Sequence, residues 1–395
     1  MQPLTEHRFT LGTLPRIHFA RGALKQLPDL LKPYGPAILL VTGRHSFDHQ
    51  PAGIALLEKL RQHGFHCSRI TLDREPSPEW VDEQVARWHG RAIDCVLAIG
   101  GGSVLDAGKA LAGLLIPGNS VLDHLEGVGP EHPYCGPALP FVAVPTTAGT
   151  GSEATRNAVL SLPGKFKKSF RDEQLMARQV VIDPDLMDSC PPALIAANGM
   201  DALTQLLESY VSSRANILMD GLAEAGLAAV RDGLLAWHDG QTNPAADKMA
   251  YAALLSGITL AHVGLGSVHG LAAPLGAFFP IGHGVACGTL LAAATRVNIE
   301  CLQQREPHSP ALQKYAQAGR LLTHRPLADT DEALDALQEN LDMLTHRLHL
   351  PRLSELGIQP GDFPRIVANS RGNSIKTNPI LLSDSEISRI LERRL

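Results

Sequence analysis

The fold is set by the sequence Asp94–Cys–Val–Leu–Ala–Ile–Gly–Gly–Gly–Ser–Val–Leu–Asp–Ala–Gly–Lys–Ala110, where an apolar strand meets three glycines and continues as a helix. The glycines let the backbone turn sharply and leave no side chain between the backbone and a ligand. Ser103 and Asp106 have the spacing of a reciprocal helix cap, which predicts a helix start here. Free N–H groups and the helix dipole at such a start favour a phosphate or pyrophosphate.

This glycine run differs from the two best-known nucleotide-binding loops. It is neither the G-x-G-x-x-G fingerprint of dinucleotide-binding proteins nor the Gly/Lys/Ser-Thr loop of nucleotide triphosphatases. The sequence predicts a phosphate-bearing cofactor at this turn, and a tight strand-to-helix turn without a ligand is the alternative.

Composition indicates a globular protein with two domains. The chain has 395 residues, 44% hydrophobic and 19% charged, with a net charge of −5. This balance argues against nucleic acid or an anionic membrane as a partner. The six cysteines are scattered without a C-x-x-C pair, and the first residues lack the basic-then-apolar pattern of a signal peptide. We therefore expect a cytoplasmic protein without a membrane span.

The first half of the chain alternates short apolar runs with helical patterns. The expected strands are 37–42, 66–72, 94–99 and 141–144, and the expected helices between them are 53–63 and 81–89. Such alternation predicts a doubly wound, parallel β-sheet in an α/β domain. Ligands of such sheets bind at the carboxyl ends of the strands, where the glycine turn lies.

The second half is rich in Ala and Leu and contains scarcely any strand pattern. Helices are expected over 201–212, 220–237, 245–262 and 330–348. We predict an α/β domain over residues 1–189 and an all-α domain over residues 190–395. The space between the two halves is the expected place for chemistry.

Four polar residues of the helical half offer oxygen and nitrogen donors. Asp201 follows Asn198–Gly199, which has the character of a turn, and is expected to open a helix whose same face carries Gln205. His269 and His283 are each followed by glycine. Carboxylate, amide and imidazole groups suit a divalent transition metal. The alternative is structural, with Asp201 complementing a helix dipole and both histidines serving the core.

Five separated segments resemble the iron-containing (group III) alcohol dehydrogenase family, and they occur in that family's order. They are Gly100–Gly–Gly–Ser–Val–Leu–Asp–Ala–Gly–Lys109, Pro145–Thr–Thr–Ala–Gly–Thr–Gly–Ser–Glu153, Gly199–Met–Asp–Ala–Leu–Thr204, His269–Gly–Leu–Ala–Ala–Pro–Leu–Gly–Ala–Phe278 and Gly282–His–Gly–Val–Ala286. The resemblance implies an N-terminal NAD(P)-binding α/β domain and a C-terminal helical domain that holds one divalent metal. This architecture is similar to that of dehydroquinate synthase.

The resemblance places Asp201, His269 and His283 on three of the four metal-ligand positions, which also makes them the catalytic residues. The fourth position is normally histidine and here is Gln205, whose neutral amide oxygen is a weaker ligand. The centre therefore either uses Gln205 or works with three protein ligands. Fe²⁺ is the metal that the family implies, and Zn²⁺ suits the same donors. Ala273 stands where many members of the family carry a further histidine.

The resemblance also implies a set of residues that contact the cofactor. They are Gly43, Gly100, Gly101, Gly102, Ser103, Asp106, Thr146, Thr147, Thr150 and Lys167. An acid after the second strand would accept a hydrogen bond from the ribose 2′-hydroxyl, but this chain has Gly43 followed by Arg44. We therefore expect NADP(H) to be accepted and preferred.

The resulting prediction is a metal- and NAD(P)-dependent alcohol dehydrogenase, or aldehyde or ketone reductase, that transfers hydride between nicotinamide and a small alcohol or carbonyl compound. A homodimer is also expected. One alternative is a metal-independent reductase resembling maleylacetate reductases. It is favoured by Gln205 and by the lysine cluster 165–168. A lyase resembling dehydroquinate synthase and a catalytically silent NAD(P)-binding relative are further alternatives.

Overall fold

The computed structural model describes residues 9–44, 46–49 and 51–395. The described chain divides into two compact units. The α/β unit comprises Thr13–Thr147 and Gly151–Ser189, and the helical unit comprises Cys190–Leu395 with 9–12 and Ala148–Thr150. Residues 1–8, which the signal-peptide argument used, and His45 of the turn after Gly43 lie outside the described residues.

The α/β unit is built on a six-stranded sheet with the order β1-β8-β5-β4-β2-β3. All neighbouring strands in it run parallel, as the sequence predicted. Its strands are β1 (Arg16–Phe19), β2 (Ala37–Gly43), β3 (His66–Leu72), β4 (Cys95–Gly100), β5 (Phe141–Pro145) and β8 (Gln179–Ile182). The predicted α/β class with a parallel sheet is therefore confirmed.

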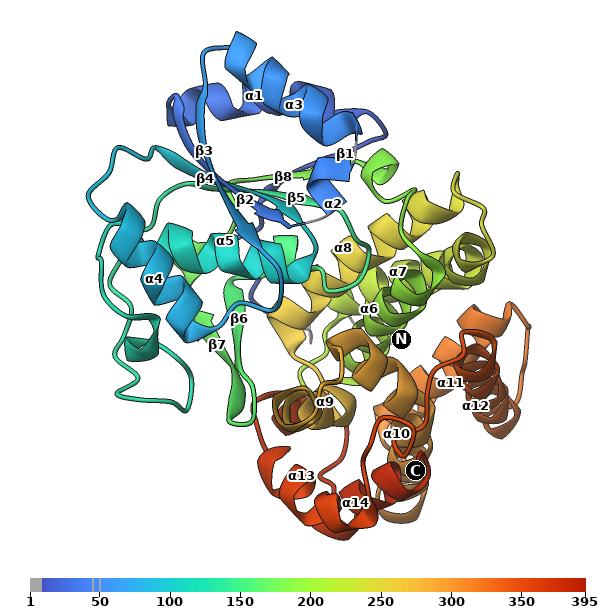
Figure 1. Ribbon diagram of the computed structural model, residues 1–395. Helices are drawn as coiled ribbons and strands as arrows, with labels where there is room; N and C mark the ends of the chain where they lie inside the picture. The colour runs from blue at the N-terminus through green and yellow to red at the C-terminus, as the bar shows by residue number, and fades with distance from the viewer. Residues whose placement is uncertain (1–8, 45, 50) are drawn as a thin grey trace. The chain divides into compact units, whose positions relative to one another are not determined.

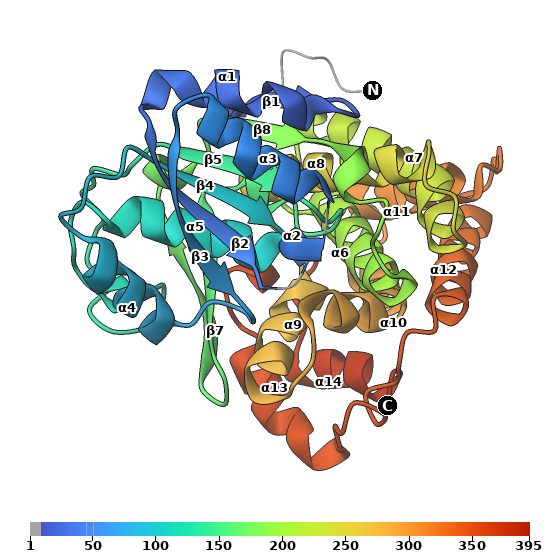
Figure 2. The same ribbon diagram turned by 45° about the horizontal axis from the view of Figure 1, so that its top comes forward.

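Helices cover both faces of this sheet (Figures 1 and 2). One face carries α1 (Leu27–Leu31) and α3 (Pro51–Gln62), and the other carries α4 (Pro78–Trp88) and α5 (Gly102–Leu114). The central strands are apolar at consecutive positions because both of their faces are buried, as in other α/β sheets. The short helix α2 (Ser46–His49) follows β2.

The glycine turn forms where the sequence predicted it, but for a different steric reason. None of Gly100, Gly101 and Gly102 has a positive φ angle. A Cβ atom on Gly100 would lie only 2.7 Å from Cβ of Val104, so the first turn of α5 can fold back over the strand end only if position 100 carries no side chain. The absence of a Cβ atom, rather than an unusual backbone conformation, is what this position requires.

The predicted capping pair is wrong. Helix α5 begins at Gly102, with Gly101 as its N-cap residue and no side-chain cap. Ser103 therefore lies inside the first turn, and Asp106 accepts a hydrogen bond from the Ser152 hydroxyl (2.6 Å) instead. The Ser-x-x-Asp spacing matched a local motif, whereas the aspartate is used for a contact with a distant segment.

Lys109 fastens α5 to that same segment. It is fully buried, and its Nζ donates to the carbonyl oxygens of Ser152 (2.8 Å) and Asn157 (2.6 Å) and to the Thr155 hydroxyl (3.0 Å). Asp106 Oδ1 lies 3.1 Å from Nζ. Burial lowers the pKa of Lys109, and the Asp106 charge opposes that shift. Lys109 of the glycine motif therefore holds α5 against the segment 152–157 within the α/β unit.

A two-stranded antiparallel hairpin follows, formed by β6 (Asn157–Leu162) and β7 (Phe166–Arg171). The sequence analysis treated 165–168 as a basic cluster and did not predict these strands. Lys167 and Lys168 lie in β7, where the hairpin pairs them with Ser161 and Leu160.

The helical unit contains helices and no strand among its described residues, which confirms the predicted all-α class. Its α-helices are α6 (Pro192–Val211), α7 (Ile217–His238), α8 (Ala245–Val263), α9 (Ser267–Phe278), α10 (His283–Arg305), α11 (Pro310–Thr323), α12 (Thr330–Arg347), α13 (Phe363–Asn369) and α14 (Asp384–Glu392). Helix α6 is central, since it packs against α7, α8, α10 and α11.

The predicted turn at Asn198–Gly199 is wrong, because both residues lie inside α6. A Cβ atom on Gly199 would come within 2.2 Å of Cδ1 of Leu234 in α7. This glycine therefore allows two helices to approach closely. Asp201 consequently lies in the middle of α6 and does not open a helix, which removes the helix-dipole explanation for its charge.

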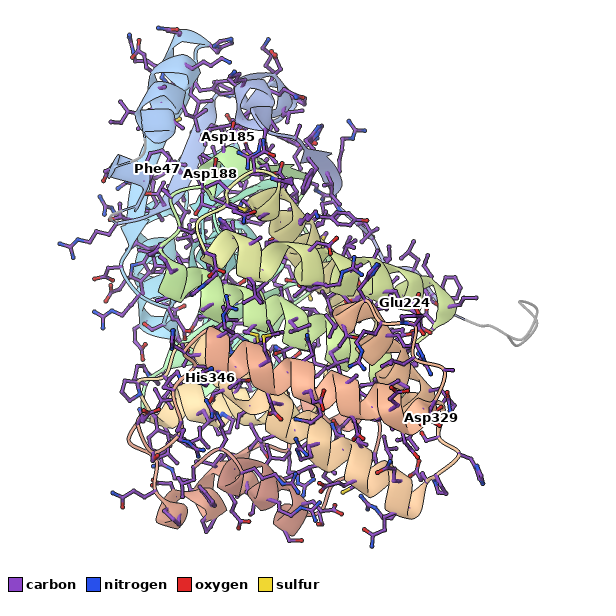
Figure 3. All side chains as sticks on the ribbon, turned by 90° about the vertical axis from the view of Figure 1, so that its right-hand side faces the viewer. Phe47, Asp185, Asp188, Glu224, Asp329 and His346 are labelled. Atoms are coloured by element: carbon purple, nitrogen blue, oxygen red, sulfur yellow. The ribbon has the colours of Figure 1, made fainter. Side chains whose placement is uncertain are left out.

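Helix α12 shows how the ends of these helices are stabilised. Asp329 is its N-cap residue and accepts a hydrogen bond from the backbone N–H of Glu332 (2.9 Å). His346 and Arg347 lie in its last turn, and Figure 3 shows Asp329 and His346 near opposite ends of the helix. Acidic groups at the start and basic groups at the end of a helix complement its dipole.

One helix of the described chain, α10, is long and apolar enough to cross a membrane by length and composition. The bent pair of α8 and α9 passes the same test only as a broken span with a 101° bend. In α10, however, 83% of the apolar window is buried inside the structure. Its apolar character is accounted for by its place in the core of the helical unit.

The contact between α5 and the sheet is sensitive to added volume. A Cβ atom on Gly108 would lie 2.7 Å from Cβ of Ala98 and 2.8 Å from Cε2 of Phe141. We predict that Gly108→Val lowers the free energy of unfolding by about 1–3 kcal/mol through overpacking. Thermal unfolding followed by circular dichroism tests this.

The matched control is Gly221→Ala in α7, where an added Cβ meets no atom within 4 Å. This change is expected to stabilise the protein by about 0.5–1 kcal/mol, because alanine is the better helix former. Equal effects from the two substitutions would contradict the packing argument.

Candidate metal centre

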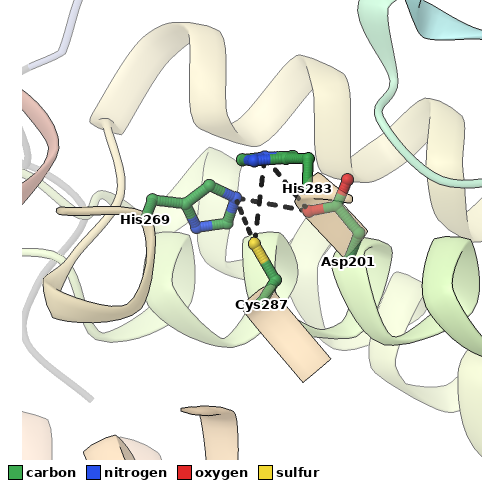
Figure 4. A group of neighbouring side chains, drawn as sticks. All are labelled: Asp201, His269, His283 and Cys287. Atoms are coloured by element: carbon green, nitrogen blue, oxygen red, sulfur yellow. Dashed lines mark hydrogen bonds and ion pairs between the residues drawn. The ribbon is translucent and has the colours of Figure 1, made fainter. Parts of the chain in front are cut away.

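Four metal-binding side chains of the helical unit converge on one point. Asp201 comes from α6, His269 from α9, and His283 and Cys287 from α10. One ligand atom from each residue lies within 4.8 Å of the other three (Figure 4). Three of these residues were predicted to bind metal. The structure therefore brings together donors that are separated by up to 86 positions in the sequence.

The distances between the donors are those of a small coordination sphere. His269 Nε2 lies 3.3 Å from Asp201 Oδ1, and His283 Nε2 lies 3.7 Å from the same oxygen. Cys287 Sγ lies 3.7 Å from His269 Nε2 and 3.8 Å from His283 Nε2. A tetrahedral ion with bonds of about 2.0 Å to nitrogen and about 2.3 Å to sulfur holds those two ligand atoms about 3.5 Å apart. The four donors therefore fit a single metal ion.

Two glycines of α10 bring its donors up to α6. A Cβ atom on Gly284 would lie 2.4 Å from the carbonyl oxygen of Ala197, and one on Gly288 would lie 2.9 Å from Cβ of Met200. Each glycine directly follows one of the α10 donors, His283 or Cys287. The two donors can approach Asp201 because their neighbours carry no side chains at the helix contact.

Glu208 fixes the position and the tautomer of His269. Its Oε2 accepts a hydrogen bond from His269 Nδ1 (2.7 Å), and its Oε1 accepts one from the backbone N–H of Val268 (2.7 Å). With Nδ1 as the donor, Nε2 of the neutral ring presents its lone pair to the other three donors. A carboxylate behind a histidine ligand is common in metal sites, where it orients the ring and raises its basicity.

Asp201 gives the strongest indication that a cation belongs here. Its side chain is 1% exposed, yet neither carboxylate oxygen has a hydrogen-bond partner. Burial raises the pKa of Asp201, but the neighbouring His283 and His269 outweigh burial and hold this pKa below its ordinary value. A buried carboxylate without hydrogen bonds stays ionised only beside positive charge, which protonated imidazoles supply here and which a bound metal ion would supply in their place.

The other buried groups show how protons compete for the centre. Burial lowers the pKa of His269, but the acidic groups of Cys287, Asp201 and Glu208 hold it well above the ordinary value. Burial raises the pKa of the Cys287 thiol to about 12. A metal must therefore displace protons from the imidazole and the thiol as it binds.

Gln205 has a hydrogen-bond partner on another helix. It lies one turn after Asp201 on α6 and is buried, and its Oε1 accepts a hydrogen bond from the Ser256 hydroxyl of α8 (2.6 Å). The prediction that Gln205 binds the metal is not tested by this contact and stays a prediction. Ala273, one turn after His269 on α9, leaves that face without a proton-transferring side chain.

Three of the predicted cofactor residues, Gly43, Gly100 and Thr146, lie at the carboxyl ends of central strands of the α/β unit. Gly43 ends β2 and Gly100 ends β4, and these two strands are neighbours in the sheet. The backbone N–H of Thr146, after β5, donates to the carbonyl oxygen of Gly100 (3.0 Å). The chain leaves β2 toward β3 on one side and β4 toward β5 on the other. Such a switch point is where doubly wound sheets bind ligands.

Two basic residues beside these strands already have acidic partners. Arg44 Nη1 lies 3.6 Å from Asp73 Oδ2, and both side chains are largely exposed. Lys167 Nζ donates to Glu75 Oε1 (2.5 Å), and the Ser161 hydroxyl donates to the other Glu75 oxygen (2.5 Å). The roles of Lys167 and Arg44 in cofactor binding stay predictions.

The sequence analysis missed Cys287 and Glu208, although both carried a spacing signal. Cys287 is four residues after His283, the interval that places two side chains on the same face of a helix. Glu208 is seven residues after Asp201, two turns along the same face of α6. His283 and Cys287 form a mixed His-x₃-Cys pair, which differs from the His-x₃-His and C-x-x-C pairs most familiar in metal sites.

Comparison with known proteins agrees with this site. Residues 15–184 match the family model described as iron-containing alcohol dehydrogenase. Residues 195–395 match the model described as Fe-containing alcohol dehydrogenase family, C-terminal. The chain belongs to the iron-containing alcohol dehydrogenase family. It is an alcohol dehydrogenase or aldehyde reductase, an oxidoreductase that acts on CH–OH groups.

Its relatives cover nearly the whole chain. The chain is 34% identical to alcohol dehydrogenase 4 of Saccharomyces cerevisiae, with 96% of both chains covered. It is 30% identical to lactaldehyde reductase of Escherichia coli, with 88% of this chain and 89% of the relative covered. A crystal structure of 1,3-propanediol oxidoreductase superimposes with a TM-score of 0.89 and 28% identity over 98% of this chain and all of the other.

The role of Glu208 can be tested without measuring turnover. We predict that Glu208→Gln weakens metal binding by roughly 10- to 100-fold, because an amide holds His269 less firmly and lowers the basicity of its ring. Competition with a chromophoric chelator measures the affinity.

The matched control for that change is Glu224→Gln in α7. The Glu224 carboxylate accepts a hydrogen bond from Tyr210 (2.6 Å) and does not contact the four donors in any described interaction. Its metal affinity should remain within about threefold of the parent, whereas a parallel loss in both variants would indicate a general effect on folding.

Proposed function

We propose that this protein is a metal- and NAD(P)-dependent alcohol dehydrogenase or carbonyl reductase, which transfers hydride between nicotinamide and a small alcohol, aldehyde or ketone. The observation that carries the proposal is the buried carboxylate of Asp201, which has two imidazoles and a thiol around it and no hydrogen-bond partner. We propose that the predicted domain of residues 1–189 binds the nucleotide and that the predicted domain of residues 190–395 binds the metal.

Asp201, His269 and His283 are proposed as the residues that would hold the metal ion. A divalent metal bound there supplies a Lewis acid that polarises the C–O bond of the substrate. Glu208 accepts a hydrogen bond from Nδ1 and so orients the His269 ring with Nε2 toward the other donors. Because Ala273 offers no proton-transferring group on α9, the proton of the alcohol is proposed to leave through water or the ribose hydroxyls of the cofactor.

The nucleotide is proposed to bind across the carboxyl ends of β2, β4 and β5. The N–H groups at the start of α5 suit its pyrophosphate. The other proposed contacts are Gly43, Gly100, Gly101, Gly102, Ser103, Asp106, Thr146, Thr147, Thr150 and Lys167. Each of these has either a place at that edge of the sheet or a position in the cofactor motifs of the family resemblance.

NADP(H) is the proposed cofactor of choice. The turn after β2 carries no acid, and the guanidinium of Arg44 forms only an exposed ion pair with Asp73. Exposed pairs of this kind contribute little, so a phosphate can compete for the arginine. One relative, from Clostridium saccharobutylicum, is an NADPH-dependent butanol dehydrogenase that is 28% identical over 96% of both chains.

Metal dependence, a cytoplasmic location and a homodimeric state are proposed as well. Donors that converge on one point favour a metal-dependent enzyme over a metal-independent reductase of the maleylacetate type. Six free cysteines are consistent with a reducing cytoplasm. A homodimer is proposed because symmetric pairs are the commonest oligomers of such enzymes.

The proposed metal role predicts a specific defect in one variant. His269→Ala should lower kcat for an aldehyde substrate by at least about 100-fold, because it removes a ligand of the ion that polarises the carbonyl. Binding of NADPH, followed by fluorescence titration, should remain within about threefold of the parent value. Unchanged turnover would refute the assigned role.

Cofactor choice is tested by comparing kcat/KM for NADPH and NADH at a saturating aldehyde concentration. The parent should prefer NADPH, and Arg44→Ala should lower kcat/KM for NADPH by roughly 10-fold while changing that for NADH little, because a hydrogen bond to a charged group contributes about 1.5–3 kcal/mol. Gly43→Asp should shift the preference toward NADH. A parent that uses NADH as well as or better than NADPH would contradict the proposal.

A further inference from the structure

We infer that Cys287 is the fourth protein ligand of the centre in place of Gln205, and that the resulting thiolate site selects Zn²⁺ over Fe²⁺. The inference rests on the proposed function only for the presence of a divalent metal. It adds the identity of the fourth ligand and the class of metal that the site accepts.

The position of Cys287 is that of a ligand. It lies one turn after His283 on α10, so both side chains project from the same face of the helix. Its Sγ is fully buried and almost equidistant from the two imidazoles, at 3.7 Å from His269 Nε2 and 3.8 Å from His283 Nε2. Figure 4 shows the sulfur joined by dashed lines to both imidazoles, as the Asp201 carboxylate is.

Gln205, by contrast, has a partner on another helix. Its amide is engaged with the Ser256 hydroxyl of α8 at 2.6 Å, and both side chains are buried. This hydrogen bond ties Oε1 to α8, and a neutral amide oxygen is a weaker metal ligand than the negatively charged thiolate that Cys287 offers. Gln205, which stands where the family normally has histidine, therefore links α6 to α8. Cys287 of α10 provides the fourth donor instead.

Sulfur ligation changes which metal is preferred. Thiolate is a soft ligand that suits Zn²⁺, and Zn²⁺ also exceeds Fe²⁺ in its general affinity for nitrogen and sulfur donors. On binding, the Sγ–H proton passes to solvent and the sulfur provides an electron pair, so no oxidant or reductant is required. The structure thus assigns to this chain a centre with a different metal preference from that implied by its family resemblance.

Cobalt substitution reports the ligand directly. The full-length protein is stripped of metal, reconstituted with one equivalent of Co²⁺ without oxygen, and its absorption spectrum is recorded. Thiolate ligation is expected to give a sulfur-to-cobalt charge-transfer band in the near ultraviolet in addition to the visible d–d bands. Cys287→Ser should lose the charge-transfer band, whereas Cys301→Ser, another buried cysteine of α10, should keep it.

Position 205 is examined in the same way. Gln205→Leu should keep the charge-transfer band and change Zn²⁺ affinity by less than about threefold, whereas Cys287→Ser should lose roughly 10- to 100-fold. The double variant Gln205→His with Cys287→Ala should regain most of the Zn²⁺ affinity and show no charge-transfer band. This rescue separates a lost ligand from a misfolded protein.

Metal selection is measured by incubating the metal-free protein with equal concentrations of Zn²⁺ and Fe²⁺ under anaerobic conditions, followed by elemental analysis. Predominant Zn²⁺ uptake by the parent, which shifts toward Fe²⁺ in the rescued double variant, is the expected result. Stoichiometric Co²⁺ binding without a charge-transfer band, or loss of metal in Gln205→Leu alone, would overturn the inference and leave the proposed function intact. Full turnover in protein that binds none of the three metals would overturn the proposed function itself.

Discussion

The close approach of α10 to α6 is the constraint on which the rest of the helical unit depends. Gly284 and Gly288 meet the backbone of Ala197 and the side chain of Met200 at distances that exclude a Cβ atom. Because His283 and Cys287 each precede one of these glycines, the helix contact and the donor positions are set together. Packing density, rather than any local preference of the ligand residues, therefore builds the centre.

The price of this arrangement is a concentration of buried polar groups. Asp201, Glu208, His269 and Cys287 are all at least about nine-tenths buried, and of these four Asp201 has side-chain oxygens without a hydrogen-bond partner. Glu208 joins α6 to the start of α9, so the same carboxylate orients His269 and holds its helix in place. Such networks are stable when fully satisfied, and here the missing partner is a cation.

Local motifs were a poor guide to local structure at two points. The Ser-x-x-Asp pair did not cap α5, because Asp106 is used by Ser152 and Lys109 from a later segment. The Asn198–Gly199 pair did not form a turn, because Gly199 is needed where α6 meets α7. In both cases a long-range contact outweighed the preference of a few neighbouring residues. The β6–β7 hairpin was missed because its second strand is rich in charge.

The sequence by itself determined the parallel sheet, its strand-to-helix glycine turn, the helical second half and three of the converging donors. The sheet, the turn and the helical half follow from hydrophobic periodicity and local motifs, whereas the three donors were implied by the family resemblance. Only the tertiary structure decided that Cys287 joins the donors and that Glu208 stands behind His269. It also placed the Gln205 amide against Ser256. These outcomes depend on how α6, α8, α9 and α10 pack, and side chains from separate helices become neighbours only after the core has formed.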